Sequence, residues 1–153
     1  MRNRVLLVLT VFATLVATGC SSASIGPIPI AGEIDGPPSI DAAPGATIRV
    51  VAHDFRLTPT VITAGAGPRA IELLNEGSIE HELIIIRTDT PFDQLVVGAN
   101  HRVDEEASIG EVAEIPPSTR ATETFELEPG NYVYICNIAG HYAKGMRGSL
   151  VVN

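Results

Sequence analysis

The stretch YICNIAGHYAKGMRG, residues 134–148, places three potential metal-binding side chains in one short loop. Cys136, His141 and Met146 follow one another with four residues between each pair. Apart from Met1 and Cys20 at the N-terminal end, the chain has no other Met or Cys. This spacing therefore brings a thiolate, an imidazole and a thioether together within a loop broken by glycines.

The chemistry of this donor set indicates one kind of metal. Structural zinc sites use Cys and His and rarely Met, whereas one Cys, two His and a weak Met form the ligand set of blue-copper electron-transfer sites. The second His must come from elsewhere, and His81 is the best candidate because it follows the turn NEGSIE and opens the apolar segment HELIII. His53 and His101 are the rivals, and we expect both to be surface residues.

The rest of the chain predicts an all-β fold. Hydrophobic residues make up 45% of the 153 residues, aromatic residues only 5%, and Gly and Pro separate many short apolar runs. Short β-rich segments with turns between them are typical of a sandwich or barrel with Greek-key connections. We predict about seven to eight strands, with segments at residues 47–53, 55–65, 69–75, 81–87, 121–127, 132–136 and 148–152.

Residues 88–118 do not continue this pattern of short strands separated by turns. They contain the acidic run DEE and several apolar residues, including Leu95, Val96 and Val97. We expect an irregular segment or a short helix. Its apolar residues are expected to cover the second face of segment 81–87, whose run of Leu and Ile indicates a strand buried on both faces.

The N-terminal residues indicate export. Two Arg in MRNR precede an uncharged apolar run, which is typical of a signal peptide. The sequence LVATGC resembles a bacterial lipobox, so we expect residues 1–19 to be a lipoprotein signal peptide and Cys20 to carry lipid. Residues 20–45, rich in Ser, Gly, Pro and Ala, are expected to form a flexible tether, and residues 46–153 the copper domain. The expected location is extracytoplasmic, on the cell membrane or the periplasmic side.

The net charge and the number of cysteines limit the partners and the kind of site that the chain can have. The formal net charge of −8 makes nucleic acid an unsuitable partner. Exported proteins usually pair their structural cysteines, and with lipid on Cys20, Cys136 has no partner. A metal bound by its thiolate would explain an isolated thiol in that setting.

Three segments resemble the cupredoxins, the small blue-copper proteins. NEGSIEHELII is similar to the family's segment around its first His ligand, and PGNYVYIC to its approach to the Cys ligand. CNIAGHYAKGM shares the ligand spacing of rusticyanin-type and sulfocyanin-type members. The resemblance covers roughly residues 46–153.

The resemblance implies roles for individual residues. His81, Cys136 and His141 would form a trigonal plane around one copper ion, with Met146 as the weak axial ligand. His141 would also be the electron port, in an apolar docking patch formed with Ile138, Ala139 and Tyr142. The implied partners are redox proteins that dock transiently.

One departure from the family pattern concerns the residue after the first His. That residue is usually Asn or another small polar residue, and here it is Glu82. The sequence therefore does not predict which groups hydrogen-bond to the Cys136 thiolate.

Other functions remain as alternatives. No nucleophile pair or phosphate-binding loop indicates an enzyme. A protein for copper storage, delivery or resistance would use the same metal, although such proteins tend to have clusters of Met and His. A metal-free thiol lipoprotein would leave His81, His141 and Met146 unexplained.

Overall fold

A computed structural model describes residues 38–153 of the chain. The expected signal peptide, the lipid attachment at Cys20 and most of the expected tether lie outside the described residues. Within the described part of the chain, no helix is both long enough and apolar enough to span a membrane.

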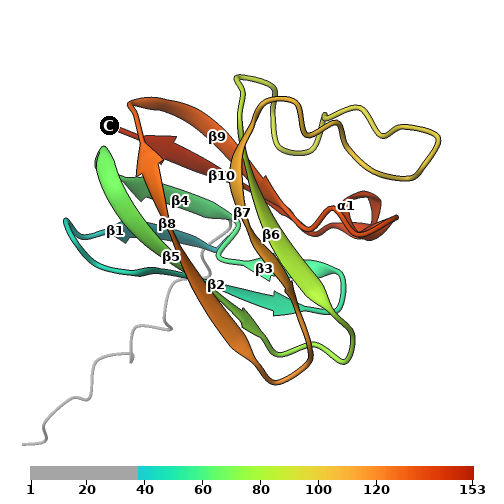
Figure 1. The fold of residues 1–153 in the computed structure, drawn as a ribbon. Coiled ribbons are helices and arrows are strands. Elements are labelled where there is room, and N and C mark those ends of the chain that lie inside the picture. The colour runs from blue at the N-terminus through green and yellow to red at the C-terminus, as the bar shows by residue number, and fades with distance from the viewer. Residues whose placement is uncertain (1–37) are drawn as a thin grey trace, which may run out of the picture. The chain divides into compact units, whose positions relative to one another are not determined.

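In residues 38–153, ten strands form two sheets that pack face to face, with one short helix at one end (Figure 1). The six-stranded sheet has the order β1 (Ser39–Ala42), β4 (Val61–Ala64), β10 (Arg147–Val152), β9 (Gly130–Ile135), β6 (His81–Arg87) and β7 (Ser108–Ile115). The four-stranded sheet has the order β3 (Arg56–Thr58), β2 (Ile48–His53), β5 (Gly67–Asn75) and β8 (Arg120–Leu127). Helix α1 spans His141–Lys144. The predicted all-β sandwich is confirmed, with ten strands instead of seven or eight.

The main core lies between the two sheets. Strand β2 buries Ile48, Val50 and Ala52 on alternate positions, and β5 buries Ile71 and Leu73 in the same way. Alternation of this kind is what one buried face and one open face require of a strand. The two sheets therefore share a core built mostly from aliphatic side chains.

Strand β6 is buried on both faces, as predicted. Its Ile84 and Ile86 belong to a second apolar cluster, on which Phe92 and Leu95 of the segment after β6 pack. The expected cover is thus present. Val96 does not contribute to it, because its side chain is 84% exposed.

Three expectations about secondary structure are wrong in detail. The single strand expected at residues 55–65 is two strands, β3 and β4, in different sheets. Residues 88–107 are irregular, as expected, but Ser108–Ile115 form strand β7, which pairs with β6. Strand β1 falls within the expected tether of residues 20–45 and pairs in parallel with β4, so the folded domain begins at or before Ser39. Strands β1 and β7 both lie at sheet edges with many exposed residues, so neither has the apolar pattern of a buried strand.

Candidate metal centre

The strand pairing brings the four predicted ligands to one end of the sandwich. His81 is the first residue of β6, and Cys136 directly follows the last residue of β9. Because β6 and β9 are antiparallel neighbours, the start of one lies beside the end of the other. His141 begins helix α1, and Met146 directly precedes β10, the other neighbour of β9.

Three of these side chains meet in the interior. The potential ligand atoms of His81, Cys136 and His141 all lie within 4.8 Å of one another. The Sγ atom of Cys136 is 3.3 Å from Nδ1 of His141 and 3.9 Å from Nδ1 of His81. His81 and Cys136 are 0% exposed and His141 is 7% exposed. Both imidazoles therefore present the same nitrogen, Nδ1, to the thiol.

Met146 lies on the same loop and is fully buried in the core cluster that includes Cys136. The loop is closed by its own backbone, since Cys136 N–H donates to the Met146 carbonyl at 3.1 Å and Met146 N–H donates to the His141 carbonyl at 3.2 Å. The two rival histidines lie outside the cluster: His53 lies beside Glu76, and His101 is exposed. The prediction of His81 as the second His in the cluster is confirmed.

The segment between β6 and β7, residues 88–107, supports the ligand loop. Its His101 carbonyl accepts a hydrogen bond from Gly140 N–H at 2.9 Å. The buried amide of Asn137, next to Cys136, accepts from Val103 N–H at 2.7 Å and donates to the Val103 carbonyl at 2.9 Å. Sequence reasoning missed Asn137, because its partner is 34 positions away in an irregular segment.

Tyr142 makes a second connection to this segment and corrects one prediction. Its hydroxyl donates to the Phe92 carbonyl and accepts from Leu95 N–H, both at 2.9 Å. The side chain is only 2% exposed, so Tyr142 cannot be part of a docking surface. Of the other expected patch residues, Ala139 is exposed and Ile138 is half-buried.

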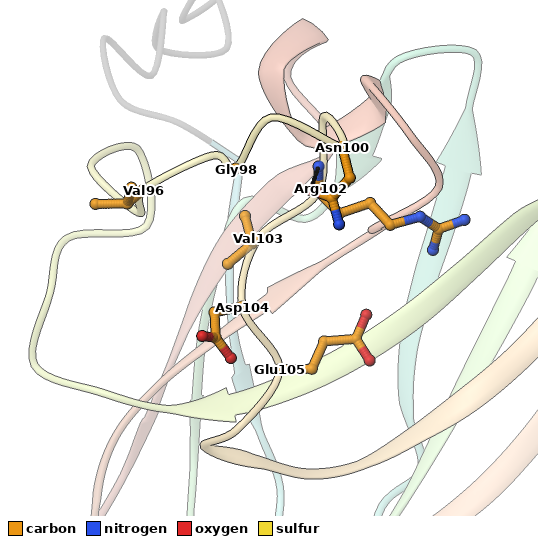
Figure 2. Close-up of a pocket in the computed structure, with 7 residues that line it drawn as sticks. All are labelled: Val96, Gly98, Asn100, Arg102, Val103, Asp104 and Glu105. Atoms are coloured by element: carbon orange, nitrogen blue, oxygen red, sulfur yellow. Dashed lines mark hydrogen bonds between the residues drawn. The ribbon is translucent and has the colours of Figure 1, made fainter.

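The same segment borders a surface hollow of about 560 Å³ (Figure 2). Figure 2 shows Val96 on one bend of the segment, with Arg102 and Glu105 further along. None of the four predicted ligands lines this hollow. The metal centre is therefore distinct from this hollow.

Burial sets the protonation of the ligands before metal enters. Burial raises the pKa of the Cys136 thiol to about 11, although the backbone N–H groups of Glu82 and Ile138 oppose the change. Burial also lowers the pKa of His81, against the effect of Asp54, and lowers the pKa of His141, with the charge of His81 adding to the effect. At neutral pH the imidazoles are therefore ready to bind a cation, while the thiol must release its proton to the incoming metal.

Glu82 is an unusual neighbour for this centre. Its side chain is 7% exposed, and Arg102 Nη1 lies 4.0 Å from its Oε1. Among the described residues, none donates a hydrogen bond to that oxygen. Burial, followed by the charge of Glu114, raises the pKa of the Glu82 carboxyl to about 7.

The donor set fits copper. A soft thiolate, two imidazoles and a buried thioether on the same loop match the preferences of copper in electron-transfer sites. Zinc would not need the Met.

Several solved structures share this fold. The chain is similar to auracyanin from Roseiflexus castenholzii, with 22% identity over 73% of this chain and 98% of that one and a TM-score of 0.59. It is similar to auracyanin A, a "blue" copper protein from Chloroflexus aurantiacus, with 23% identity over 75% and 99% of the two chains and a TM-score of 0.55. Rusticyanin from Thiobacillus ferrooxidans matches with 19% identity over 80% and 86% and a TM-score of 0.57. The fold is therefore that of the cupredoxins.

The sequence also defines the family. Residues 60–153 match the sulfocyanin (SoxE) domain, so the chain belongs to that family. No curated protein sequence matches the chain. The protein is a blue-copper electron carrier, and His81, Cys136, His141 and Met146 form its type 1 copper site. The family consists of electron carriers, which agrees with the expectation that the chain is not an enzyme.

Proposed function

We propose that this protein transfers single electrons on the extracytoplasmic side of a bacterial membrane, to which lipid on Cys20 tethers it. The observation that carries the electron-transfer part is the buried cluster of His81, Cys136 and His141, whose ligand atoms lie within 4.8 Å of one another. The tether is supported by the lipobox-like sequence that ends at Cys20.

Copper supplies the one-electron couple when it is bound. The protein contributes ligands that keep their places: His81 is fixed on a strand, and the ligand loop is closed by backbone hydrogen bonds between Cys136 and Met146 and between Met146 and His141. Electron transfer is fastest when the coordination geometry of the metal changes little between its two oxidation states. A buried site with ligands held in this way serves that requirement.

Electrons enter and leave through His141, the most exposed of the four ligands at 7%. Ala139 and Ala143 are exposed beside it, and Ile138 is half-buried. A redox partner would dock on these small apolar residues for a short time. Such a surface gives little affinity, which suits rapid exchange of partners.

Two cysteine variants separate the two parts of the proposal. In a bacterial host that makes the full-length protein, Cys136→Ser should abolish the intense thiolate-to-copper absorption while the protein stays in the membrane fraction. Cys20→Ser should keep the blue colour while the protein leaves that fraction. An unchanged blue colour in Cys136→Ser would refute the ligand assignment, and a membrane-bound Cys20→Ser protein would refute the lipid anchor.

A redox experiment distinguishes electron transfer from copper storage, delivery or resistance. A carrier should pass through repeated oxidation and reduction with its copper retained, even in the presence of a copper(I) chelator. Loss of copper on each reduction would favour the copper-handling alternative.

The docking surface is tested by adding a charge beside the port. Ala139→Glu should slow electron self-exchange between copper(I) and copper(II) protein, measured by NMR line broadening. Ala46→Glu is the control, because Ala46 is exposed and precedes β2, whereas the end of β2 lies at His53 beside the copper end. Equal rates in the two variants would contradict docking at His141.

A further inference from the structure

A carboxylate that sequence reasoning did not assign lies against the His81 ligand. Asp54 follows strand β2 in the turn to β3, and its Oδ1 is 3.4 Å from Nε2 of His81. The other ring nitrogen, Nδ1, faces the thiol of Cys136 at 3.9 Å. One edge of the imidazole therefore faces the metal centre, and the other faces a negative charge.

Ser78 fixes both oxygens of this carboxylate. Its backbone N–H donates to Oδ1 of Asp54 at 2.8 Å, and its hydroxyl donates to Oδ2. Ser78 belongs to the turn that directly precedes β6, the strand that begins with His81. The turn that precedes His81 thus also orients Asp54, the carboxylate beside the outer nitrogen of the His81 ring.

Gly77 makes this close approach possible. A Cβ atom at this position would lie 2.4 Å from Oδ1 of Asp54 and 2.7 Å from Nε2 of His81. Its own N–H donates to the side-chain oxygen of Asn75 at 2.9 Å, which holds the turn against the pair. Any residue with a side chain would have to displace the carboxylate or the ring.

These contacts have a consequence for the metal. A carboxylate that accepts a hydrogen bond from the outer N–H of a ligand His fixes the ring's tautomer and orientation and raises its basicity as a ligand. A negative charge close to the ligand also favours the more positive of two metal oxidation states.

We propose that Asp54 is a positioning residue for the copper site: it holds His81 with its proton on Nε2 and its Nδ1 lone pair toward the metal, and its charge stabilises copper(II) over copper(I). This inference depends on the copper site described above. Reduction adds one electron to the site and leaves Asp54 unchanged, so its charge lowers the reduction potential. Four residues of this chain form the arrangement of carboxylate and ring: Asp54, Gly77, Ser78 and His81.

The first test separates the charge from the hydrogen bond. Asp54→Asn keeps an acceptor oxygen but removes the charge. At a fixed solution potential, it should increase the ratio of copper(I) to copper(II) protein roughly threefold to tenfold; tenfold corresponds to about 59 mV for one electron. Glu76→Gln is the matched control, because Glu76 carries the same charge in the neighbouring turn between β5 and β6, where its carboxylate lies 3.9 Å from Nε2 of His53. Its ratio should change less than about twofold.

The second test needs no copper. Nitrogen-15 NMR of copper-free protein labelled at His should show His81 with its proton on Nε2. Asp54→Ala should shift this ring toward a mixture of tautomers and accelerate exchange of that proton, while Asp54→Asn should largely preserve the tautomer. Circular dichroism of each variant shows whether the fold is retained.

The outcomes are decisive in both directions. Equal redox ratios in Asp54→Asn and Glu76→Gln would overturn the effect of the charge. An unchanged tautomer in Asp54→Ala would overturn the positioning role and leave Asp54 as a link between two turns. A wild-type protein without blue colour would instead refute the copper assignment, and the copper-free measurement would still test the contact.

Discussion

Glu82 makes the stability of the copper-free protein depend on pH in an unusual direction. The pKa of its carboxyl is raised from 4.5 to about 7, first by burial and then by the charge of Glu114. Between these values the folded protein binds more protons than the unfolded chain does. The free energy of unfolding therefore falls as the pH rises through this range, and the loss is complete above the folded pKa.

The perturbation is Glu82→Gln, which has nearly the same shape and no charge at any pH. Between about pH 5 and about pH 8, the linkage relation gives a loss of about 2–3 kcal/mol from Glu82 in the wild-type protein. The variant lacks this contribution. We therefore expect the difference in unfolding free energy, variant minus wild type, to increase by about 2–3 kcal/mol over the same interval.

Urea unfolding of copper-free protein at the two pH values measures this difference. Groups that do not interact with Glu82 contribute equally to both proteins and cancel. Glu80→Gln is the control, because Glu80 is exposed two positions away on the same approach to the site, and its difference should not depend on pH. Parallel loss of stability in wild type and Glu82→Gln would refute the assignment of a buried, poorly compensated carboxylate.

Two further predictions concern the ligand loop and its support. Met146→Leu should keep copper bound but raise the reduction potential, because a weak donor to copper(II) is lost; voltammetry checks this, and a fall in potential would contradict the axial role. Tyr142→Phe should cost about 1–3 kcal/mol of stability, because the Phe92 carbonyl and Leu95 N–H lose their shared partner. Hydrogen exchange at the Leu95 amide should accelerate in that variant, and an unchanged rate would show that Tyr142 does not hold the segment.

The ligands could be predicted from the sequence because their side chains are scarce and regularly spaced. Cys136 and Met146 are the only residues of their kinds in the part of the chain that the structure describes. His81 could be placed because a turn and an apolar strand surround it. For these residues, local sequence carries nearly all the information.

The surroundings of the ligands could not be predicted in the same way. The contact of Asp54 with His81 joins residues 27 positions apart, and it depends on how two turns meet after the sheets have packed. Strand β7 was missed because, among its eight residues, only Val112 and Ile115 are buried. Tyr142 was placed on the surface because its burial depends on residues 88–107, whose path has no regular pattern.

One turn contacts both imidazole ligands, which argues that the site is built from more than its own loop. Asp54 lies against His81, and the next residue, Phe55, packs edge-on against His141 with ring centroids 5.4 Å apart and planes at 87°. Phe55 has a φ of 66°, a conformation that side chains other than Gly, Asn and Asp seldom adopt and that carries a cost of order 1–3 kcal/mol. The surrounding structure must compensate this strain, and Gly145 fits closely there, since a Cβ at that position would lie 3.0 Å from the Phe55 carbonyl. Strained backbone of this kind concentrates at functional sites. The β2–β3 turn therefore contacts both imidazole ligands, and we expect it to restrict their movement as much as the ligand loop does.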